Sequence, residues 1–360
     1  MKILAIDIGA GTEDILLYDK SKTIENCIKM VLPCPSLVFS SKVRRITQLG
    51  KDILIEGEII GGGAFSSALK AHLARGYRVL MSRETAYTIR NDLEEVRQLG
   101  IEIFDEESEP IHFSGETLKI NEVNIQELRR FFTNFGEEFS DVEVVSIAVQ
   151  DHGIPPKGLS NRKFRFEEIR KVLKRDRKLE NLAFIEDETP SYFLRMRSAV
   201  KSAKRQLPEA KVVVMDTCPA AILGCLEDPL VKAVDPVLAI NVGNAHTMAT
   251  IVSRGKVEGI MEHHTRLLNP AKIERFLKDF ANGKLTDDKI FIDGGHGLFL
   301  LSDPPKFSEI GIVAATGPNR KLLSKTKLKV HYANPAGDVM MTGPVGLIEA
   351  VKKKLRIKGK

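Results

Sequence analysis

The chain has 360 residues, more than one ordinary hydrophobic core accommodates, so we expect two lobes or domains. Apolar residues make up 43% and charged residues 28% of the sequence, which is typical of a soluble globular protein. No apolar run reaches the roughly 18 residues of a membrane span, and no signal-peptide pattern follows Met1. We therefore expect a cytoplasmic protein with no membrane attachment.

The net charge of +6 is concentrated in one part of the chain. Residues 157–211 contain 16 Lys/Arg against 8 Asp/Glu. Such a basic segment can bind nucleic acid or an anionic substrate, but it carries no recognised nucleic-acid motif. The preferred interpretation is a solvated face of helices, with an anionic small molecule as the alternative and nucleic acid not expected.

The four cysteines at positions 27, 34, 218 and 225 form two C-x6-C pairs. This spacing matches no zinc or iron–sulfur code. Cys218 and Cys225 lie seven residues apart and share one face of a predicted helix. We expect reduced, structural thiols, and a metal or redox role is the alternative.

The first predicted element is a hairpin over residues 4–19. A dinucleotide fingerprint would need a third glycine after Gly9 and Gly11, but the chain has Asp14 there, and no Gly-Lys-Ser/Thr follows. The bend is followed by the apolar run 15–18, which has the length of a strand. The glycines therefore predict the bend of a hairpin and not the start of a helix.

Strands and helices then alternate along the chain. An extended stretch at 52–60 ends in three glycines at 61–63, and the basic segment after residue 155 reads as largely helical. The other predicted elements are helices at 64–75, 86–99 and 125–135 and strands at 77–81, 142–149 and 212–215. This alternation predicts an α/β protein.

Residues 237–252 repeat the design of the opening hairpin. Each copy has an apolar strand, a polar residue, a glycine one residue later, a short bend with Thr and a second apolar strand. The corresponding positions are Asp7, Gly9 and Thr12 in the first copy and Asn241, Gly243 and Thr247 in the second. Two copies so far apart predict two similar lobes that face each other.

Such hairpin bends can bind phosphate. Glycine permits positive φ angles and a close approach of phosphate, so consecutive N–H groups can point at one anion. Asp7 would repel phosphate directly, so we expect it to hold Mg²⁺, through water. One hairpin alone is as well explained by an ordinary turn; the paired occurrence favours a nucleotide site.

Three further motifs complete a recognisable order. Asp216 precedes an apolar helix pattern at 217–226, a Thr316-Gly317 turn follows the apolar run at 313–315, and a second helix pattern covers 336–346. With the two hairpins, this order resembles the superfamily of actin, sugar kinases and the large heat-shock chaperones. More narrowly, residues 148–153 and 216–221 resemble a mostly archaeal family labelled as related to pyruvate formate-lyase activating enzyme. Radical-SAM chemistry is rejected because it needs three clustered cysteines.

The resemblance implies an α/β, two-lobed actin-like ATPase (ribonuclease H-like) fold with a nucleotide cleft between the lobes. The first lobe would cover 1–226, with a basic helical insertion at about 155–211; the second would cover 236–335, and a C-terminal connecting helix 336–360. ATP and Mg²⁺ are the implied cofactors. The implied nucleotide-binding residues are Asp7, Gly9, Gly11, Thr12, Asn241, Gly243, Asn244, His246, Thr247, Thr316, Gly317, Pro318 and Asn319.

Asp216 falls where the chaperones carry an acidic residue near the attacking water, so it is a catalytic candidate and, with Asp7, a metal ligand. Asp151, at the end of a predicted strand, is the second catalytic candidate, although Asp-His is also a common turn composition. The superfamily usually has Asp where this chain has Asn241, which favours slow turnover. His246 either donates to a phosphate or is a surface histidine.

We therefore expect a Mg²⁺-dependent ATP-binding protein that acts as a slow ATPase switch or a phosphotransferase. Two alternatives remain: a small-molecule kinase for an anionic substrate, and an ATP-dependent activator of a metalloenzyme. The activator would need Cys pairs near a dimer interface. Nucleotide is the expected partner, together with an anionic small molecule or a protein, and a homodimer is left open.

Overall fold

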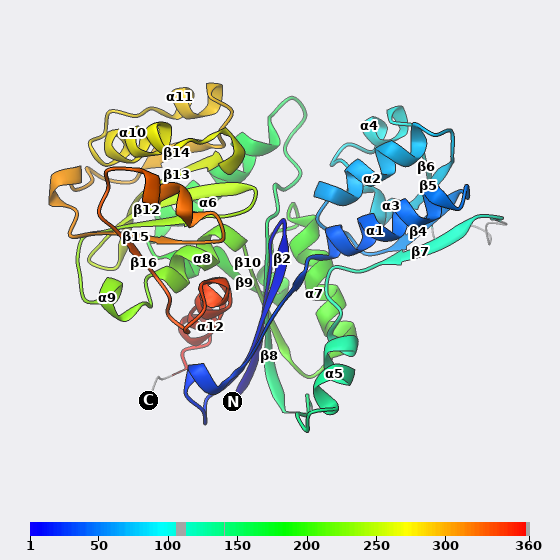
Figure 1. The fold of residues 1–360 in the computed structure, drawn as a ribbon, viewed down its shortest axis with the longest axis horizontal. Helices are drawn as coiled ribbons and strands as arrows, with labels where there is room; N and C mark the ends of the chain where they lie inside the picture. Colours follow the sequence, from blue (N-terminus) through cyan, green and yellow to red (C-terminus); the bar gives the residue numbers. More distant parts are fainter. Residues whose placement is uncertain (106–112, 140, 358–360) are drawn as a thin grey trace.

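The computed structural model describes residues 1–105, 113–139 and 141–357. These residues form three β-sheets with helices packed around them (Figure 1). None of the helices in these ranges is both long and apolar enough to cross a membrane. Short 3₁₀ helices η1–η7 lie at Ile24–Asn26, Leu179–Leu182, Glu186–Glu188, Thr265–Leu267, Phe307–Glu309, Arg320–Lys325 and Val339–Met341.

The first sheet has the strand order β3-β2-β1-β8-β10-β9. β1 pairs antiparallel with β2 and parallel with β8, and β10 pairs parallel with β8. The inner strands are continuous apolar runs because both of their faces are covered. The bounds are β1 Lys2–Ile8, β2 Thr12–Asp19, β3 Ile28–Pro33, β8 Val142–Val149, β9 Ala183–Ile185 and β10 Lys211–Met215.

The second sheet repeats this arrangement. Its order is β14-β13-β12-β11-β15-β16, in which β11 pairs antiparallel with β12 and parallel with β15. Strands β13-β12-β11-β15-β16 thus repeat β3-β2-β1-β8-β10 in order and direction, which is the duplicated pattern of the actin-like fold. The predicted two-lobed fold is confirmed. The bounds are β11 Val237–Val242, β12 His246–Ser253, β13 Lys256–His264, β14 Gly297–Leu300, β15 Ile312–Thr316 and β16 Val330–Tyr332.

Two helices cross between the sheets with unusually close backbones. They are α8 (Thr217–Cys225) and α12 (Thr342–Lys354), the cores of the two predicted connecting helices. A Cβ on Gly224 would lie 1.8 Å from the carbonyl oxygen of Thr342, and a Cβ on Gly346 would lie 1.9 Å from that of Ala220. Only glycine fits at this crossing, so these two residues fix how closely the helices pack.

The remaining helices of the second lobe lie on its outer side (Figure 1). They are α9 (Pro229–Lys232), α10 (Pro270–Ala281) and α11 (Asp287–Ile292). The apolar face of α10 packs onto the second sheet and buries Phe276 and Phe280. Asn269 caps the start of α10 by accepting from the backbone N–H of Lys272.

The third sheet belongs to a separate unit between β3 and β8 (Figure 1). All neighbouring strands in its order, β6-β5-β4-β7, run parallel, and the unit has its own hydrophobic core. The sequence analysis did not separate this unit from the first lobe. Its elements are α1 Pro35–Gln48, β4 Ile53–Gly57, α2 Gly63–Leu73, β5 Val79–Ser82, α3 Arg83–Ala86, α4 Leu93–Gln98, β6 Ile101–Phe104 and β7 Glu116–Ile120.

Two local predictions differ from the structure in this unit. The helix predicted at 86–99 is shortened to α4, because α3 ends at Ala86 and Asp92 begins α4 by accepting from the backbone N–H of Glu94. The stretch around Cys34, which reads as irregular, leads directly into α1 with Pro35 at its first position. Pro is favourable at the first position of a helix, because a backbone N–H at that position would have no acceptor within the helix.

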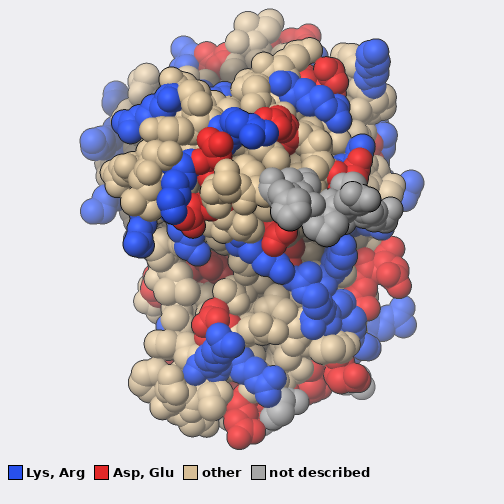
Figure 2. Space-filling view, turned by 90° about the vertical axis from the view of Figure 1, so that its right-hand side faces the viewer, with Lys and Arg blue, Asp and Glu red and all other residues tan. Residues whose placement is uncertain are grey.

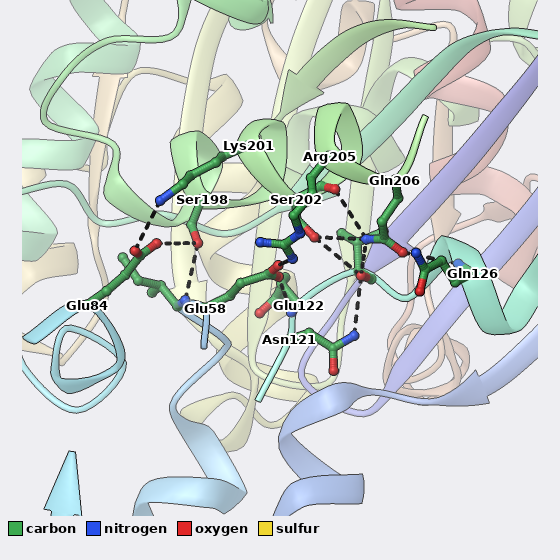
Figure 3. A network of polar contacts seen from close by, with 12 residues as sticks. Glu58, Glu84, Asn121, Glu122, Gln126, Ser198, Lys201, Ser202, Arg205 and Gln206 are labelled. Atoms are coloured by element: carbon green, nitrogen blue, oxygen red, sulfur yellow. Dashed lines mark hydrogen bonds and ion pairs between the residues drawn. The ribbon is translucent and has the colours of Figure 1, made fainter. Parts of the chain in front are cut away.

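A polar network fastens the third-sheet unit to the first lobe (Figure 3). Its side chains project from α7 (Leu194–Gln206) toward the ends of β4 and β7 and toward α3 and α5 (Ile125–Thr133). Arg205 pairs with Glu58, and Lys201 lies 3.5 Å from Glu84. Ser198 accepts from the backbone N–H of Ile59 at 3.2 Å. The attachment is therefore polar, unlike the apolar cores on either side of it.

The basic segment supplies many of these contacts. It contains α6 (Asn161–Arg175), β9 and α7, and at least eight of its sixteen Lys/Arg form ion pairs within the protein. Figure 2 shows the face on the side of the third-sheet unit, where basic and acidic side chains are likewise interspersed. Much of the segment's positive charge is thus neutralised by neighbouring carboxylates.

Candidate functional site

A cavity of about 450 Å³ lies where the two lobes and the third-sheet unit meet. The bends of both hairpins line it, as do the loop after β8, the turn after β15 and the start of α12. The predicted site residues in its wall are Asp7, Gly9, Thr12, Asp151, Asn241, Gly243, Asn244, His246, Thr316, Gly317 and Pro318. Most of the predicted set therefore converges on one place.

The two bends have the same length and the same closing hydrogen bond. Gly9 N–H donates to the Thr12 carbonyl, and Gly243 N–H donates to the His246 carbonyl, both at 2.9 Å. His246, and not Thr247, therefore stands where Thr12 stands in the first copy. The bends also meet, because a Cβ on Gly11 would lie 2.4 Å from the amide nitrogen of Asn244.

Thr247 differs from its neighbours in the predicted set. Its side chain is buried within β12, and its hydroxyl lies 2.9 Å from that of Thr265. Thr265 also donates to the carbonyl of Gly243 at 2.9 Å. Thr247 thus supports the second bend from behind, since the one-residue shift turns its side chain away from the cavity wall.

Asp7 lies near the end of β1 and is buried, with Oδ1 lacking a hydrogen-bond partner among the described residues. The start of α12 approaches it so closely that a Cβ on Gly343 would lie 1.8 Å from Oδ2. Burial, followed by repulsion from Asp14 and Asp216, raises the pKa of Asp7 well above its ordinary value. A bound cation would offset this cost and favour the ionised carboxylate.

Two more carboxylates lie on β2 beside this position. Burial raises the pKa of Asp14 to about 7, and burial with repulsion from Glu122 raises the pKa of Glu13 to about 8. Asp14 also lines the cavity, although the sequence analysis used it only to exclude a dinucleotide motif. The first bend is therefore surrounded by acidic groups that hold their protons near neutral pH.

The turn after β15 braces the second bend. Gly317 adopts φ +93°, and a Cβ there would lie 2.5 Å from the carbonyl oxygen of Val242, so glycine is required. Asn319 donates to the carbonyl of Gly243 at 3.1 Å, and Thr316 donates to the hydroxyl of Thr342 at 2.9 Å. Asn319 thus acts on the shape of the bend and does not line the cavity.

Asp216 is buried beneath the cavity and does not line it. It caps α8 by accepting from the backbone N–H of Cys218, and it forms a bidentate pair with Arg165 at 2.9 Å. Arg165 also pairs with Glu262 of the second lobe at 2.7 Å. Burial raises the pKa of Asp216, and the guanidinium of Arg165 opposes that rise. At Glu262 burial is outweighed by Arg165 together with His246 and His152, and the pKa is lowered.

Asp151 follows β8 and lines the cavity, but both of its carboxylate oxygens accept backbone hydrogen bonds. The donors are Gly153 N–H at 2.8 Å and Met196 N–H at 3.0 Å. Burial still raises the pKa of Asp151 above its ordinary value, despite these bonds. The residue therefore holds the loop after β8 against the start of α7 while one edge faces the cavity.

A group of histidines that no sequence motif indicated lies beside the second bend. His152 follows β8, His246 begins β12 and His296 precedes β14, and one nitrogen from each lies within 4.8 Å of the other two. His264 lies next to them, with ring centroids 4.8 Å and 4.9 Å from those of His246 and His296. No spacing code links these residues, because three separate loops bring them together.

All four cysteines are buried and free. Over the part of the chain that the structure describes, the histidine group is the only set of three or more His, Cys, Asp or Glu placed to hold a metal ion. The cysteines thus do not converge on one point there.

Several solved structures are similar to this chain at low identity. They include a ROK family transcriptional regulator, a homolog of the E. coli MLC protein (10% identity, TM-score 0.28, covering 71% of this chain and 37% of that one). The inorganic polyphosphate/ATP-glucomannokinase from Arthrobacter sp. strain KM is another (11%, 0.36, 99% of each chain). The activator of 2-hydroxyisocaproyl-CoA dehydratase from Clostridium difficile, with bound ADPNP, is a third (8%, 0.33, 100% and 99%).

No curated protein matches the chain. A family model described as "Putative pyruvate format-lyase activating enzyme (DUF1786)" matches residues 60–322. That match covers most of the chain, including the loop after β8, both connections to α8 and the whole second hairpin. It agrees with the narrower resemblance of the sequence. The protein therefore belongs to the DUF1786 family and has the actin-like, two-lobed fold.

Proposed function

We propose that the chain binds ATP with Mg²⁺ in the cavity between its two hairpin bends and couples binding to slow hydrolysis or phosphoryl transfer. The observation that carries the proposal is the pair of matching bends that face each other across one cavity, with the buried Asp7 carboxylate beside them. A family label alone does not carry it, because function depends on the site and not on the fold.

The residues present fit a nucleotide and its metal. Gly9, Gly243 and Gly317 add no side chains to the cavity wall, and the bend N–H groups can contact phosphate oxygens. α12 begins at the cavity, and the start of a helix favours anions. Asp7 is the residue to hold Mg²⁺, which would neutralise phosphate charge.

Turnover is expected to be slow. The second bend has the neutral Asn241 where the first has Asp7, so this side can donate or accept hydrogen bonds but adds no charge. Asp216 is engaged by Arg165 and is less available to a metal or a water than the sequence suggests. Asp151, at the cavity edge, is the better candidate to accept a proton from an attacking group.

A second candidate is a small-molecule kinase. The cavity extends beyond the two bends to a wall formed by residues 59–63 and 87–91 of the third-sheet unit. Phosphates and metal alone would not need this wall, which could hold a phosphoryl acceptor. Arg90 and Arg195 line the same end, so an anionic acceptor is favoured, although Arg195 already pairs with Glu122.

The activator alternative is less well supported. A cluster that bridges subunits needs thiolates near a shared surface, whereas Cys27, Cys34, Cys218 and Cys225 are all buried. Burial raises the pKa of Cys218 well above its ordinary value, which disfavours the thiolate that ligates iron. A switch that acts on a protein partner through nucleotide-dependent closure remains part of the proposal.

Calorimetric titration with ATP and ADP, each with and without Mg²⁺, tests the proposal. We expect Mg²⁺-dependent binding that Asp7→Asn weakens by at least about tenfold, since the variant removes the charge that holds the metal. Asp19→Asn is the matched control, because Asp19 ends the same hairpin at its exposed side and bonds to Ser21. The absence of binding at millimolar nucleotide, or equal binding by Asp7→Asn, would refute the proposal.

A further inference from the structure

We propose that His152, His246 and His296 form a second metal site, selective for Zn²⁺-like cations, that joins the two lobes at the edge of the cavity. The inference goes beyond the proposed nucleotide function and does not depend on it. The ligand atoms of the three residues lie within 4.8 Å of one another. Nitrogens around a tetrahedral zinc are about 3.4 Å apart, so small side-chain shifts would close the site.

His296 gives the independent indication of a ligand. Its side chain is 99% buried, and neither ring nitrogen has a hydrogen-bond partner among the described residues. Nε2 of His246 also lacks one. Buried polar atoms of this kind nearly always have a partner, so a cluster of imidazole nitrogens without partners indicates a bound ligand. A metal ion between the three rings would be that ligand.

The charged groups around the histidines are of both signs. Arg165 lies nearby and pairs with Asp216 and Glu262, and Arg162 donates to the carbonyl of Gly295. Glu262 Oε1 lies 3.6 Å from Nδ1 of His296. A carboxylate behind a ligating imidazole orients the ring and leaves Nε2 for the metal. Glu262 makes no hydrogen bond to His296 at this distance, but a small shift of the ring would let its carboxylate accept from Nδ1 once Nε2 binds the metal.

The three ligand atoms determine which metal the site would prefer. A set of three imidazole ligands without a carboxylate ligand suits Zn²⁺ and similar transition-metal ions, whereas Mg²⁺ prefers oxygen ligands. Three protein ligands leave one coordination position open, and both His152 and His246 line the cavity. The open position is thus available to an oxygen of a bound anion or to water.

The position of the ligands adds a mechanical consequence. His152 belongs to the first lobe and follows β8, whereas His246 and His296 belong to the second lobe. One ion bound by all three would connect the lobes beside the hairpin tips. The site therefore couples metal loading to lobe closure.

Metal-free full-length protein, prepared with a chelator, tests the proposal by titration with Zn²⁺ and with Co²⁺ as a spectroscopic substitute. We expect one equivalent to bind, a visible Co²⁺ ligand-field spectrum without thiolate charge transfer, and a rise in Tm. His152→Ala and His296→Ala should each lower the affinity more than about 100-fold. His331→Ala is the matched control, since His331 lies on β16 and contacts Asp228.

Two outcomes would overturn the proposal: no stoichiometric binding by the wild-type protein, or unchanged affinity in both ligand variants. A thiolate charge-transfer band would overturn it too, because it would place the metal on cysteine. If His296→Ala does not fold, His152→Ala, in a half-buried loop position, keeps the test decisive. Asp7→Asn separates the two sites, since it should weaken Mg²⁺-dependent nucleotide binding and retain the Co²⁺ spectrum.

Discussion

The two hairpins share one backbone geometry but present different chemistry. Their bends have equal length and the same 2.9 Å closing hydrogen bond, and they arise from sheets with the same strand order. The first bend is surrounded by the carboxylates of Asp7, Glu13 and Asp14, whereas Asn241 and His246 stand in the second. The two copies thus share the shape of the bend, while the side chains beside it are carboxylates in the first copy and an amide and an imidazole in the second.

The largest expected effect comes from removing the charge that links the two copies. Arg165→Met leaves the buried carboxylates of Asp216 and Glu262 without their cation, which should lower the free energy of unfolding by about 3–5 kcal/mol. Arg170→Met on the same helix is the control, because its exposed pair with Glu167 should contribute at most about 1 kcal/mol. Urea unfolding measures both. Equal losses in the two variants would contradict the proposed role of Arg165.

The next effect comes from the crossing of α8 and α12. Gly224→Ala places a Cβ where the Thr342 carbonyl lies 1.8 Å away, so the helices must separate, and we expect a loss of about 2–4 kcal/mol. Gly9→Ala is the comparison, because its nearest contact, the Thr12 carbonyl, is 3.6 Å away. Thermal unfolding followed by circular dichroism compares them. A Gly224→Ala variant with the wild-type Tm would show that the crossing tolerates a wider spacing.

A smaller effect should appear in the pH dependence of stability. Burial raises the pKa of Asp14 to about 7, so the folded protein binds a proton that the unfolded chain releases near pH 4. Its contribution is therefore complete below about pH 4 and is lost as pH rises to about 7. The free energy of unfolding should therefore fall less between about pH 4 and pH 7 in Asp14→Asn than in the wild-type protein, by about 1–3 kcal/mol. Asp19→Asn should show no such change, because hydrogen bonds from Ser21 lower the pKa of Asp19; an unchanged slope in Asp14→Asn would refute the assignment.

The smallest effect tests the difference between the copies directly. Asn241→Asp gives the second bend the carboxylate that the first has, and we expect a stronger Mg²⁺ dependence of nucleotide binding, by about tenfold or less, since burial opposes the new charge. Calorimetry at several Mg²⁺ concentrations measures it. Asn319→Asp is the control, since it adds a carboxylate to an exposed residue that braces the same bend. An equal gain in both variants would mean that general electrostatics, and not the position of Asn241, sets the metal dependence.

Much of the fold could be predicted because its signals are local. An apolar run before a glycine bend predicted both hairpins, and β8 has the bounds expected from the sequence, Val142–Val149. The third-sheet unit was not separated, because parallel pairing joins strands that are distant in the chain and leaves no local mark. The alignment of Thr247 with Thr12 was off by one residue, because the closing hydrogen bond of the second bend goes to the carbonyl of His246, which the sequence pattern does not indicate.

The candidate site was predictable only where backbone shape defines it. Glycines and the Thr316-Gly317 turn could be read from the sequence, since each position demands a particular conformation. The capping role of Asp216 was not predicted, because the resemblance indicated a catalytic carboxylate at that position. Its pairing with Arg165 and the histidine group were not predicted either, because these contacts join segments whose order in the chain says nothing of their distance in space.

The contact between the tips of the two bends has a kinetic consequence. A Cβ on Gly11 would touch the side-chain amide of Asn244, so the tips must part or this side chain must swing aside before phosphates enter between the bends. If nucleotide binds there as proposed, this opening precedes association, and the observed association rate should level off at high nucleotide concentration. The close crossing of α8 and α12 joins the lobes at the start of α12, so we expect the hairpin tips to be the part that moves.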